Sequence, residues 1–331
     1  MANVQKYFEQ FHNTIRTDYE MNRTLREKKD IILQLLRKRL REAHQPGFDE
    51  LLQGSYSTPL RMGVRPIAAL QFDIDIGLRF AFDDKECSAS EVRKWIYDAV
   101  AGHTDSVVEM GPCIRVGYAD GYHADLVCYA NWVDSVGQEQ FRLAHRTKGW
   151  RPADPPALLA YVKSARTLFE GTEDSKTKTD QLRRVVRYLK RWYDEAIPKE
   201  SDAKPTGLAF LLLAIERLGP TYAWDGSADD RAALRSLAVY ASGLAGRIVA
   251  YKPTPEYEDM FGRLSDNNMD VLKSRFHAMV DALDQAKTEP DPVEACKALR
   301  QVFGNDFPIP KPEDTAKQTA APAIVTSSSS A

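Results

Sequence analysis

Two acidic residues alternate with apolar residues in the run Phe72-Asp73-Ile74-Asp75-Ile76. Successive side chains of a β-strand point to opposite faces, so Asp73 and Asp75 share one face while the isoleucines point into a core. A third acid, Asp125, lies in a second apolar run, Ala124-Asp125-Leu126-Val127-Cys128. The pattern predicts a sheet that is buried on one side and carries carboxylates on the other.

These carboxylates predict a metal site. Acids held close together repel one another unless cations neutralise them, and hard cations such as Mg²⁺ or Mn²⁺ prefer oxygen ligands and substrate phosphates. We predict two ions: Asp73 and Asp75 hold the ion that bridges a triphosphate, and Asp125 with one of the pair holds a second ion. The second ion would lower the pKa of an attacking hydroxyl, whose proton Asp125 is a candidate to receive. The predicted chemistry is nucleotidyl transfer with pyrophosphate as the leaving group.

The short run Gln53-Gly54-Ser55 precedes the acids in the chain. A glycine at position 54 lets the backbone approach a ligand closely, and the Ser55 hydroxyl beside backbone amides suits the terminal phosphates of a nucleotide. A Gly-Ser pair alone is typical of a turn. It is the acids that follow which favour the phosphate-binding interpretation.

The composition of the chain favours some classes of protein and disfavours others. The chain has 331 residues, of which 43% are hydrophobic, and this fits a soluble globular protein of two domains. A net charge of -2 and a pI of about 6.3 disfavour an obligate duplex DNA partner. The four cysteines show neither zinc-site nor disulfide spacing. The chain contains no apolar run of membrane-spanning length, so we expect no membrane partner and a cytoplasmic location.

Periodicity predicts an α+β fold. We expect one or two helices in residues 4–44, then a mixed sheet region with a strand at 71–82, a Ser-capped helix at 90–101, and paired strands at 107–116 and 122–129. Helical patterns follow near residues 157–169, 178–196, 206–218, 229–249, 267–287 and 291–303. The predicted domains are residues 1–150 with the sheet, residues 151–308 as a helical domain, and residues 309–331 as a flexible tail.

Several of these segments resemble one family. Gln53-Gly54-Ser55-Tyr56, the run from Phe72 to Leu78, and the run from Tyr122 to Val127 are similar to the polymerase-β-type nucleotidyltransferase pattern, in the form found in the cGAS/DncV-like nucleotidyltransferases of bacterial anti-phage (CBASS) defence. Residues 150–155, 182–192 and 204–207 resemble the helical-domain segments of that family. The similarity spans about residues 50 to 215 in order, which is more specific than any single motif.

The resemblance implies a bilobed protein, with a polymerase-β-like palm joined to a helical domain and the site between them. It implies an enzyme that joins ATP and other ribonucleoside triphosphates into a cyclic di- or trinucleotide messenger. Triphosphate contacts would come from Arg187, Lys190 and Thr206, although a solvated basic helix explains the two basic residues equally well. The resemblance also suggests a HORMA-type activator, or a ubiquitin-transfer-like protein that conjugates the C-terminal tail.

Two other function classes stay open at this stage. One is an adenylyltransferase that acts on RNA or on a small molecule such as an antibiotic. An RNA substrate would demand a basic groove, which the acidic pI disfavours. The other is a nucleotide-binding module without catalysis, against which the presence of all three acids argues. His123 either orients Asp125 or only packs beside it. No sequence code predicts the bases, linkage or ring size of the product.

Overall fold

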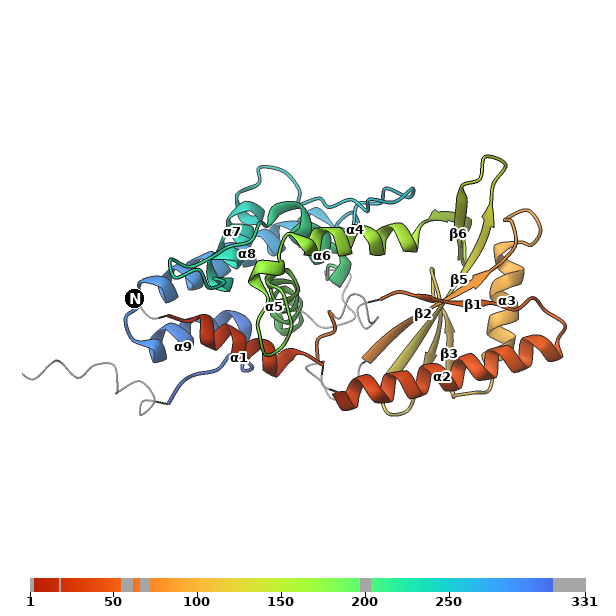
Figure 1. The fold of residues 1–331 in the computed structure, drawn as a ribbon, viewed down its shortest axis with the longest axis horizontal. Coiled ribbons are helices and arrows are strands. Elements are labelled where there is room, and N and C mark those ends of the chain that lie inside the picture. The colour runs from red at the N-terminus through yellow and green to blue at the C-terminus, as the bar shows by residue number, and fades with distance from the viewer. Residues whose placement is uncertain (1–2, 18, 55–61, 66–71, 197–203, 312–331) are drawn as a thin grey trace, which may run out of the picture.

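The computed structural model describes residues 3–17, 19–54, 62–65, 72–196 and 204–311, without the side chains of residues 19–22, 52, 72, 73 and 196. Within these ranges the fold is α+β, as predicted, because a mixed sheet with flanking helices is followed by a helical half. Figure 1 shows the sheet at the right and most of the helices at the left. Residues 312–331, most of the predicted tail, lie outside the described ranges.

The strands form one mixed sheet. They are β1 (Asp49–Leu52), β2 (Phe72–Phe80), β3 (Ser106–Glu109), β4 (Ile114–Gly117), β5 (Tyr122–Val133), β6 (Glu139–His145) and β7 (Gly149–Ala153). The order is β1-β2-β5-β4-β3, and β6 pairs with the end of β5 and with β7. Only β2 and β5 are parallel among these pairs. The two predicted acid-bearing strands are therefore direct neighbours at the centre of the sheet.

The two faces of the sheet differ in what covers them. On one face, Ile74, Ile76, Leu126 and other alternate residues pack against α2 (Tyr19–Glu42) and α3 (Ala89–Val100) in one buried cluster. The opposite face carries a smaller cluster that includes Val127 and Tyr129. Since paired residues on neighbouring strands point to the same side, Asp75 and Asp125 share this second face. The alternation of the sequence thus leaves these two acids on the side away from α2 and α3.

Local sequence explains where helix α3 begins. Ser88 accepts a hydrogen bond from the backbone of Glu91, and the Glu91 carboxylate accepts one from the backbone of Ser88, which is a capping box. Helix α3 therefore begins at Ala89, and its cap is Ser88.

The strand predictions hold in the centre of the sheet and fail at its margins. Strand β2 and the first part of β5 lie where they are predicted. The single strand predicted at 107–116 is wrong: β3 and β4 form an antiparallel hairpin that turns between residues 109 and 114. Strands β1, β6 and β7 were not predicted, because their polar residues do not alternate cleanly with apolar ones.

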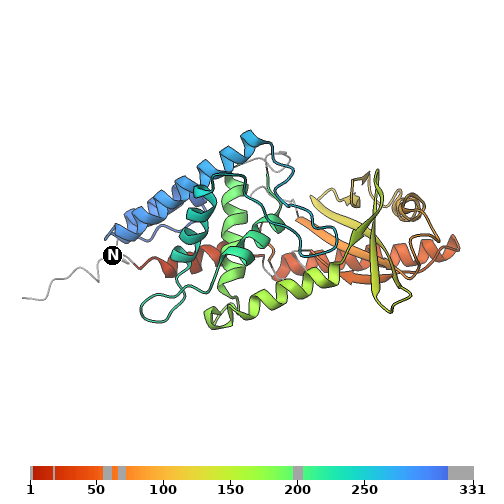
Figure 2. The ribbon, with the colours of Figure 1, turned by 90° about the horizontal axis from the view of Figure 1, so that it is seen from above.

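The helical half has its own core. Its helices are α4 (Pro155–Thr167), α5 (Gln181–Ala196), α6 (Gly207–Arg217), α7 (Asp230–Gly243), α8 (Asp266–Thr288) and α9 (Pro292–Phe303), with a short 3₁₀ turn η1 (Glu170–Thr172). All match predicted helices, but α7 ends at Gly243 rather than near residue 249. Both views show α4 running from the strands to the other helices (Figures 1 and 2).

Helix α1 (Gln5–Ile15) packs with the helical half although it opens the chain. Its residues Phe8 and Phe11 are fully buried and contact Tyr188 of α5 and Phe303 of α9 through their rings. The N-terminal segment therefore contributes to both halves, since α2 covers the sheet. The domain boundary at residue 150 stays a prediction.

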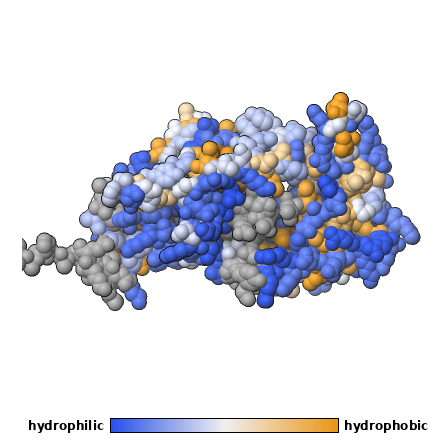
Figure 3. Space-filling model, viewed as in Figure 1, coloured by the Kyte–Doolittle hydropathy of each residue, from blue (hydrophilic) through white to orange (hydrophobic). Residues whose placement is uncertain are grey.

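The exposed apolar side chains of the described surface include two valines of one hairpin. The tip of the β5–β6 hairpin exposes Val133 and Val136. Figure 3 shows apolar surface at the upper right of the molecule. No helix in the described ranges is long and apolar enough to cross a membrane.

Candidate active site

Asp75, Asp125 and Arg115 form a row across three neighbouring strands. Asp75 of β2 is the register partner of Asp125 of β5, and Asp125 is the partner of Arg115 of β4. Direct neighbours in a sheet lie about 5 Å apart on the same face. Two of the three predicted carboxylates are thus brought together. The backbone of Asp73 pairs with His123 one step along the same strands, while the side chain of Asp73 is outside the described atoms.

Arg115 binds Asp125 through both ends of its guanidinium group. Nε donates to Oδ1 and Nη2 donates to Oδ2, each at 2.7 Å. The Asp125 side chain is 11% exposed and that of Arg115 is 33% exposed, so the pair is largely shielded from water. Two parallel charge-assisted hydrogen bonds of this kind fix the plane of the carboxylate. Arg115 was not predicted as a site residue, because its contact depends on the register of β4 with β5.

Gly54 lies against the carboxylate of Asp75. Its backbone has φ +77°, and a Cβ atom added there would lie 2.2 Å from Oδ2 of Asp75. Only glycine fits such a close approach in this conformation. The predicted cradle residue Gly54 and the predicted acid Asp75 are therefore in contact. Ser55, the next cradle residue, lies outside the described residues.

Gln53 is held by a buried tyrosine. The hydroxyl of Tyr129 on β5 donates to Oε1 of Gln53 at 2.9 Å. Burial, first, and then the charges of Asp75 and Glu256 raise the pKa of Tyr129 far above its ordinary value. Tyr129 is therefore a neutral donor at physiological pH. Its role was missed in the sequence, where it is one more apolar position of β5.

Cys113 lies beside the same acids. Burial raises the pKa of its thiol well above the usual range, with Asp125 contributing in the same direction. The thiol is therefore protonated and buried. Among the described residues the cysteines are free, without disulfides.

The residues that are present fit a divalent cation. Asp75 and Asp125 offer hard carboxylate oxygens side by side, the donor type that Mg²⁺ and Mn²⁺ prefer. Within the described part of the chain no group of three or more His, Cys, Asp or Glu side chains could hold a metal. The third predicted ligand, Asp73, has no described side chain. Both the third ligand and the number of ions stay predictions.

Arg187 of α5 is buried and bonded to protein groups. Its Nε donates to the carbonyl of Gly63 at 3.1 Å, and its Nη1 donates to Nε2 of His12 at 2.7 Å. Burial first, and then the charge of Arg183, lower the pKa of Arg187 to about 10. In this structure its guanidinium tethers α1 and the segment Met62–Arg65 to the helical half. A solvated basic helix does not describe this residue.

Lys190 and Thr206 lie close together at the start of α6. Thr206 caps the helix by accepting from the backbone of Ala209, and a Cβ on Gly207 would lie 3.0 Å from Cε of Lys190. Lys190 Nζ also donates to the carbonyl of Met62 at 3.1 Å. A cation beside a helix N-terminus is a favourable setting for phosphate. The segment that Lys190 and Arg187 hold runs between the Gly54 cradle and strand β2.

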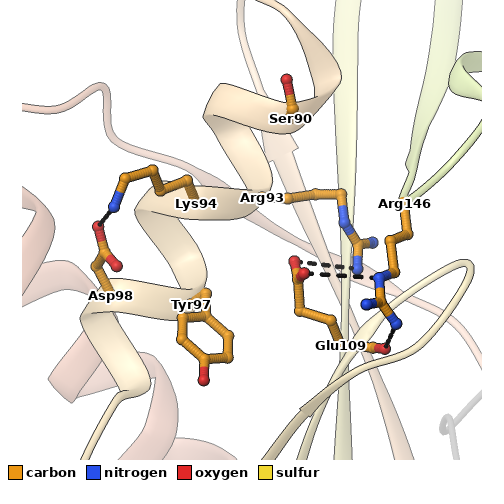
Figure 4. Close-up of a pocket in the computed structure, with 7 residues that line it drawn as sticks. All are labelled: Ser90, Arg93, Lys94, Tyr97, Asp98, Glu109 and Arg146. Carbon is orange, nitrogen blue, oxygen red and sulfur yellow. Dashed lines mark hydrogen bonds and ion pairs between the residues drawn. The ribbon is translucent and has the colours of Figure 1, made fainter.

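A separate hollow of about 370 Å³ contains none of the predicted site residues (Figure 4). Figure 4 shows Arg93 and Arg146 converging on Glu109, with separations of 3.6 and 3.8 Å. Arg93 is fully buried and donates to the carbonyls of Met110, Cys113 and Ala144. We assign this cluster to the structural connection between α3, the β3–β4 turn and β6.

The sequence is similar to one family model and to a curated protein. Residues 49–129, which contain Gly54, Asp73, Asp75 and Asp125, match the family model "Cyclic GMP-AMP synthase DncV-like, nucleotidyltransferase domain". A curated cyclic GMP-AMP synthase of Escherichia albertii is 24% identical over an alignment of 202 residues that covers 58% of this chain. The matched region spans only 42% of that relative's length.

Solved structures share the fold over nearly the whole chain. The Vibrio cholerae DncV cyclic AMP-GMP synthase has a TM-score of 0.73 at 17% identity, covering 92% of this chain and 97% of that one. DncV in complex with the linear intermediate 5′ pppA(3′,5′)pG has a TM-score of 0.71 at 16% identity, covering 92% and 98%. Escherichia coli DncV in its 3′-deoxy GTP bound form has a TM-score of 0.69 at 14% identity, covering 89% and 93%. The predicted polymerase-β-like palm and the predicted resemblance are confirmed.

Proposed function

We propose that this chain, a cGAS/DncV-like nucleotidyltransferase by these matches, joins ribonucleoside triphosphates into a cyclic di- or trinucleotide with release of pyrophosphate. One observation carries the proposal: Asp75 and Asp125 are register partners on parallel strands, and Gly54 lies against Asp75. This geometry places two carboxylates and a close-approaching backbone within one domain that matches the family model.

Asp73, Asp75 and Asp125 would hold Mg²⁺ or Mn²⁺, with two ions in our proposal, and the bound cations supply neutralisation of the charge on the triphosphate. The protein's own groups bind and orient. Gly54 brings backbone amides close to the phosphates, and Tyr129 fixes the side chain of Gln53 beside them. Asp125, held in one plane by Arg115, is the proposed acceptor for the proton of the attacking hydroxyl.

Lys190 and Thr206 are the proposed contacts to the triphosphate from the helical half. This proposal is supported by the position of Lys190, which lies beside the N-terminus of α6. Backbone amides and the hydroxyl of the capping residue Thr206 lie at this N-terminus. We retain Ser55 and Arg187 as proposed nucleotide-binding residues on the strength of the family pattern. The guanidinium of Arg187 already donates to His12 and to Gly63.

We propose ATP as one substrate. The product assay described below would identify any second nucleotide. Two of the similar solved structures contain the linear intermediate 5′ pppA(3′,5′)pG and a bound 3′-deoxy GTP. We further propose a role in anti-phage signalling in the cytoplasm, where such triphosphates are available. This role rests on the family resemblance.

We also propose a protein partner, either a HORMA-type activator or a ubiquitin-transfer-like protein that conjugates the C-terminal tail. Residues 312–331 are rich in Ala, Thr and Ser, a composition that disfavours a buried core. We expect deletion of these residues to abolish conjugation or activator response while leaving the fold intact. Unchanged conjugation, activator binding and activity would remove the tail from the proposal.

The test is an incubation of the purified chain with the four ribonucleoside triphosphates and Mg²⁺ or Mn²⁺, followed by phosphatase and mass spectrometry. A cyclic product has no terminal phosphate and survives. We expect a resistant product that is absent for Asp75→Asn and present for Asp98→Asn, whose carboxylate is exposed and bound to Lys94. Adenylate transferred only to added RNA or to an antibiotic would instead support the alternative transferase.

A further inference from the structure

Arg115 places a positive charge at the end of a row that otherwise carries two negative ones. Asp75, Asp125 and Arg115 follow one another across β2, β5 and β4. Arg115 occupies both oxygens of Asp125, at 2.7 Å each. The row therefore contains a cation of the protein itself beside the acid pair.

Physical chemistry gives this cation two opposite effects. It reduces the repulsion between neighbouring carboxylates, which stabilises the folded chain when no metal is bound. It also repels any divalent cation that approaches the same oxygens, and it competes for their lone pairs. Because Asp125 is 89% shielded from water, these effects are screened less than on an open surface.

We propose that Arg115 is a resident cation of the acid pair: it holds Asp125 in the metal-free enzyme, releases part of this contact when a divalent cation binds, and thereby sets the affinity of that cation. The proposal deepens the proposed function and rests on the metal site within it. Arg115 is a positioning residue in this scheme, since it acts through Asp125.

The chain offers a matched control on the opposite half of the molecule. Arg235 of α7 binds Asp284 of α8 with the same two-point contact of Nε and Nη2. This pair joins two helices and lies among none of the proposed site residues. Arg235→Gln therefore removes the same kind of contact without touching the acids.

The experiment measures Mn²⁺ binding in the absence of nucleotide. Free Mn²⁺ is followed by electron paramagnetic resonance for the wild type, Arg115→Gln, Arg115→Lys and Arg235→Gln, and thermal unfolding is recorded for each with and without Mn²⁺. We expect Arg115→Gln to lower the metal-free Tm, to bind Mn²⁺ about three- to tenfold more tightly, and to gain more Tm from Mn²⁺ than the wild type does. Arg115→Lys, which keeps the charge, should stay near the wild type, as should Arg235→Gln.

Unchanged or weaker Mn²⁺ binding by folded Arg115→Gln would overturn the inference and leave Arg115 as a structural support of β4 and β5. Arg115→Lys shows whether the charge or the shape of the side chain matters. Tighter Mn²⁺ binding in both Arg115→Gln and Arg115→Lys would also contradict a charge effect. The product assay separates this outcome from failure of the proposed function. A wild type that makes product while Arg115→Gln binds Mn²⁺ normally refutes only the inference, and tighter Mn²⁺ binding in a chain that makes no product refutes only the function.

Discussion

Gly54 lies directly against the carboxylate of Asp75, so that a Cβ at position 54 would come within 2.2 Å of Oδ2 and 2.8 Å of Cβ of Asp75. The segment that follows β1 is thereby held in contact with β2 at Asp75. Any side chain at position 54 must displace Asp75, since the backbone of a central strand has little freedom to move.

Replacement of Gly54 by alanine should abolish most activity. Displacing a reacting group by about 1 Å costs roughly a hundredfold in turnover, and the alanine also needs a positive φ, which costs about 1 kcal/mol. The control is Gly102→Ala, where φ is +72° but nothing lies within 4 Å. In urea unfolding both variants should lose the stability that a positive φ costs alanine, and Gly54→Ala should lose more because it also displaces Asp75, while only Gly54→Ala loses turnover. Equal activity in the two variants would contradict the proposed contact.

Replacement of Asp125 by asparagine should reduce turnover roughly a thousandfold, because it removes a charged oxygen that faces the reacting groups. It also removes the charge that Arg115 binds, so we expect a lower Tm than for Asp98→Asn. Initial rates and thermal unfolding check the two effects separately. Full activity in Asp125→Asn would exclude this residue from the site.

Replacement of Tyr129 by phenylalanine should raise the KM for ATP about fivefold with a smaller effect on kcat. The lost hydrogen bond to Gln53 contributes about 1 kcal/mol, and without it the Gln53 amide can rotate away from the nucleotide. Tyr118→Phe is the control, since its hydroxyl contacts His103 on the other side of the palm. A fall in kcat alone would show that Tyr129 acts on chemistry rather than on binding.

His12 should make the fold sensitive to acid. Burial, first, and then the charge of Arg187 lower the pKa of His12 from 6.5 to about 2. Between these two pH values His12 binds a proton in the unfolded chain but not in the folded chain. Stability that is fully present above pH 6.5 is therefore lost as the pH falls, by about 2 kcal/mol between pH 7 and pH 5. Urea unfolding should show a steeper loss of stability between pH 7 and pH 5 for the wild type than for His12→Asn, which keeps the contributions of His103 and His145, whose pKa values burial also lowers. His277→Asn, at an exposed position of α8, should keep the wild-type slope.

The alternation around Asp73 and Asp125 was enough to predict the central strands, because one buried face imposes a period of two on the sequence. It could not predict β1 or β6, whose runs Asp49–Leu52 and Glu139–His145 lack that period. These strands are held by pairing with β2 and β5 rather than by a pattern of their own.

The contacts of the site depended on information that local sequence does not contain. The pairing of Arg115 with Asp125 requires the register of β4 with β5, and the hold of Tyr129 on Gln53 joins residues far apart in the chain. Arg187 shares a helix face with Lys190, as its spacing predicts, but only the fold shows that Gly63 and His12 cover this residue. Helix periodicity predicts which side chains share a face, and packing decides what that face meets.

The parallel pairing of β2 with β5 also sets the order in which the protein can acquire its site during synthesis. Helix α3 and the β3–β4 hairpin are made between the two strands, and each can form from residues near one another in the chain. The pairing of Asp75 with Asp125 requires closure of the long loop that contains them, which slows its formation. A nascent chain that has released β2 but not β5 from the ribosome therefore presents only one half of the acid pair, and cannot yet bind metal or nucleotide as the finished enzyme is proposed to do.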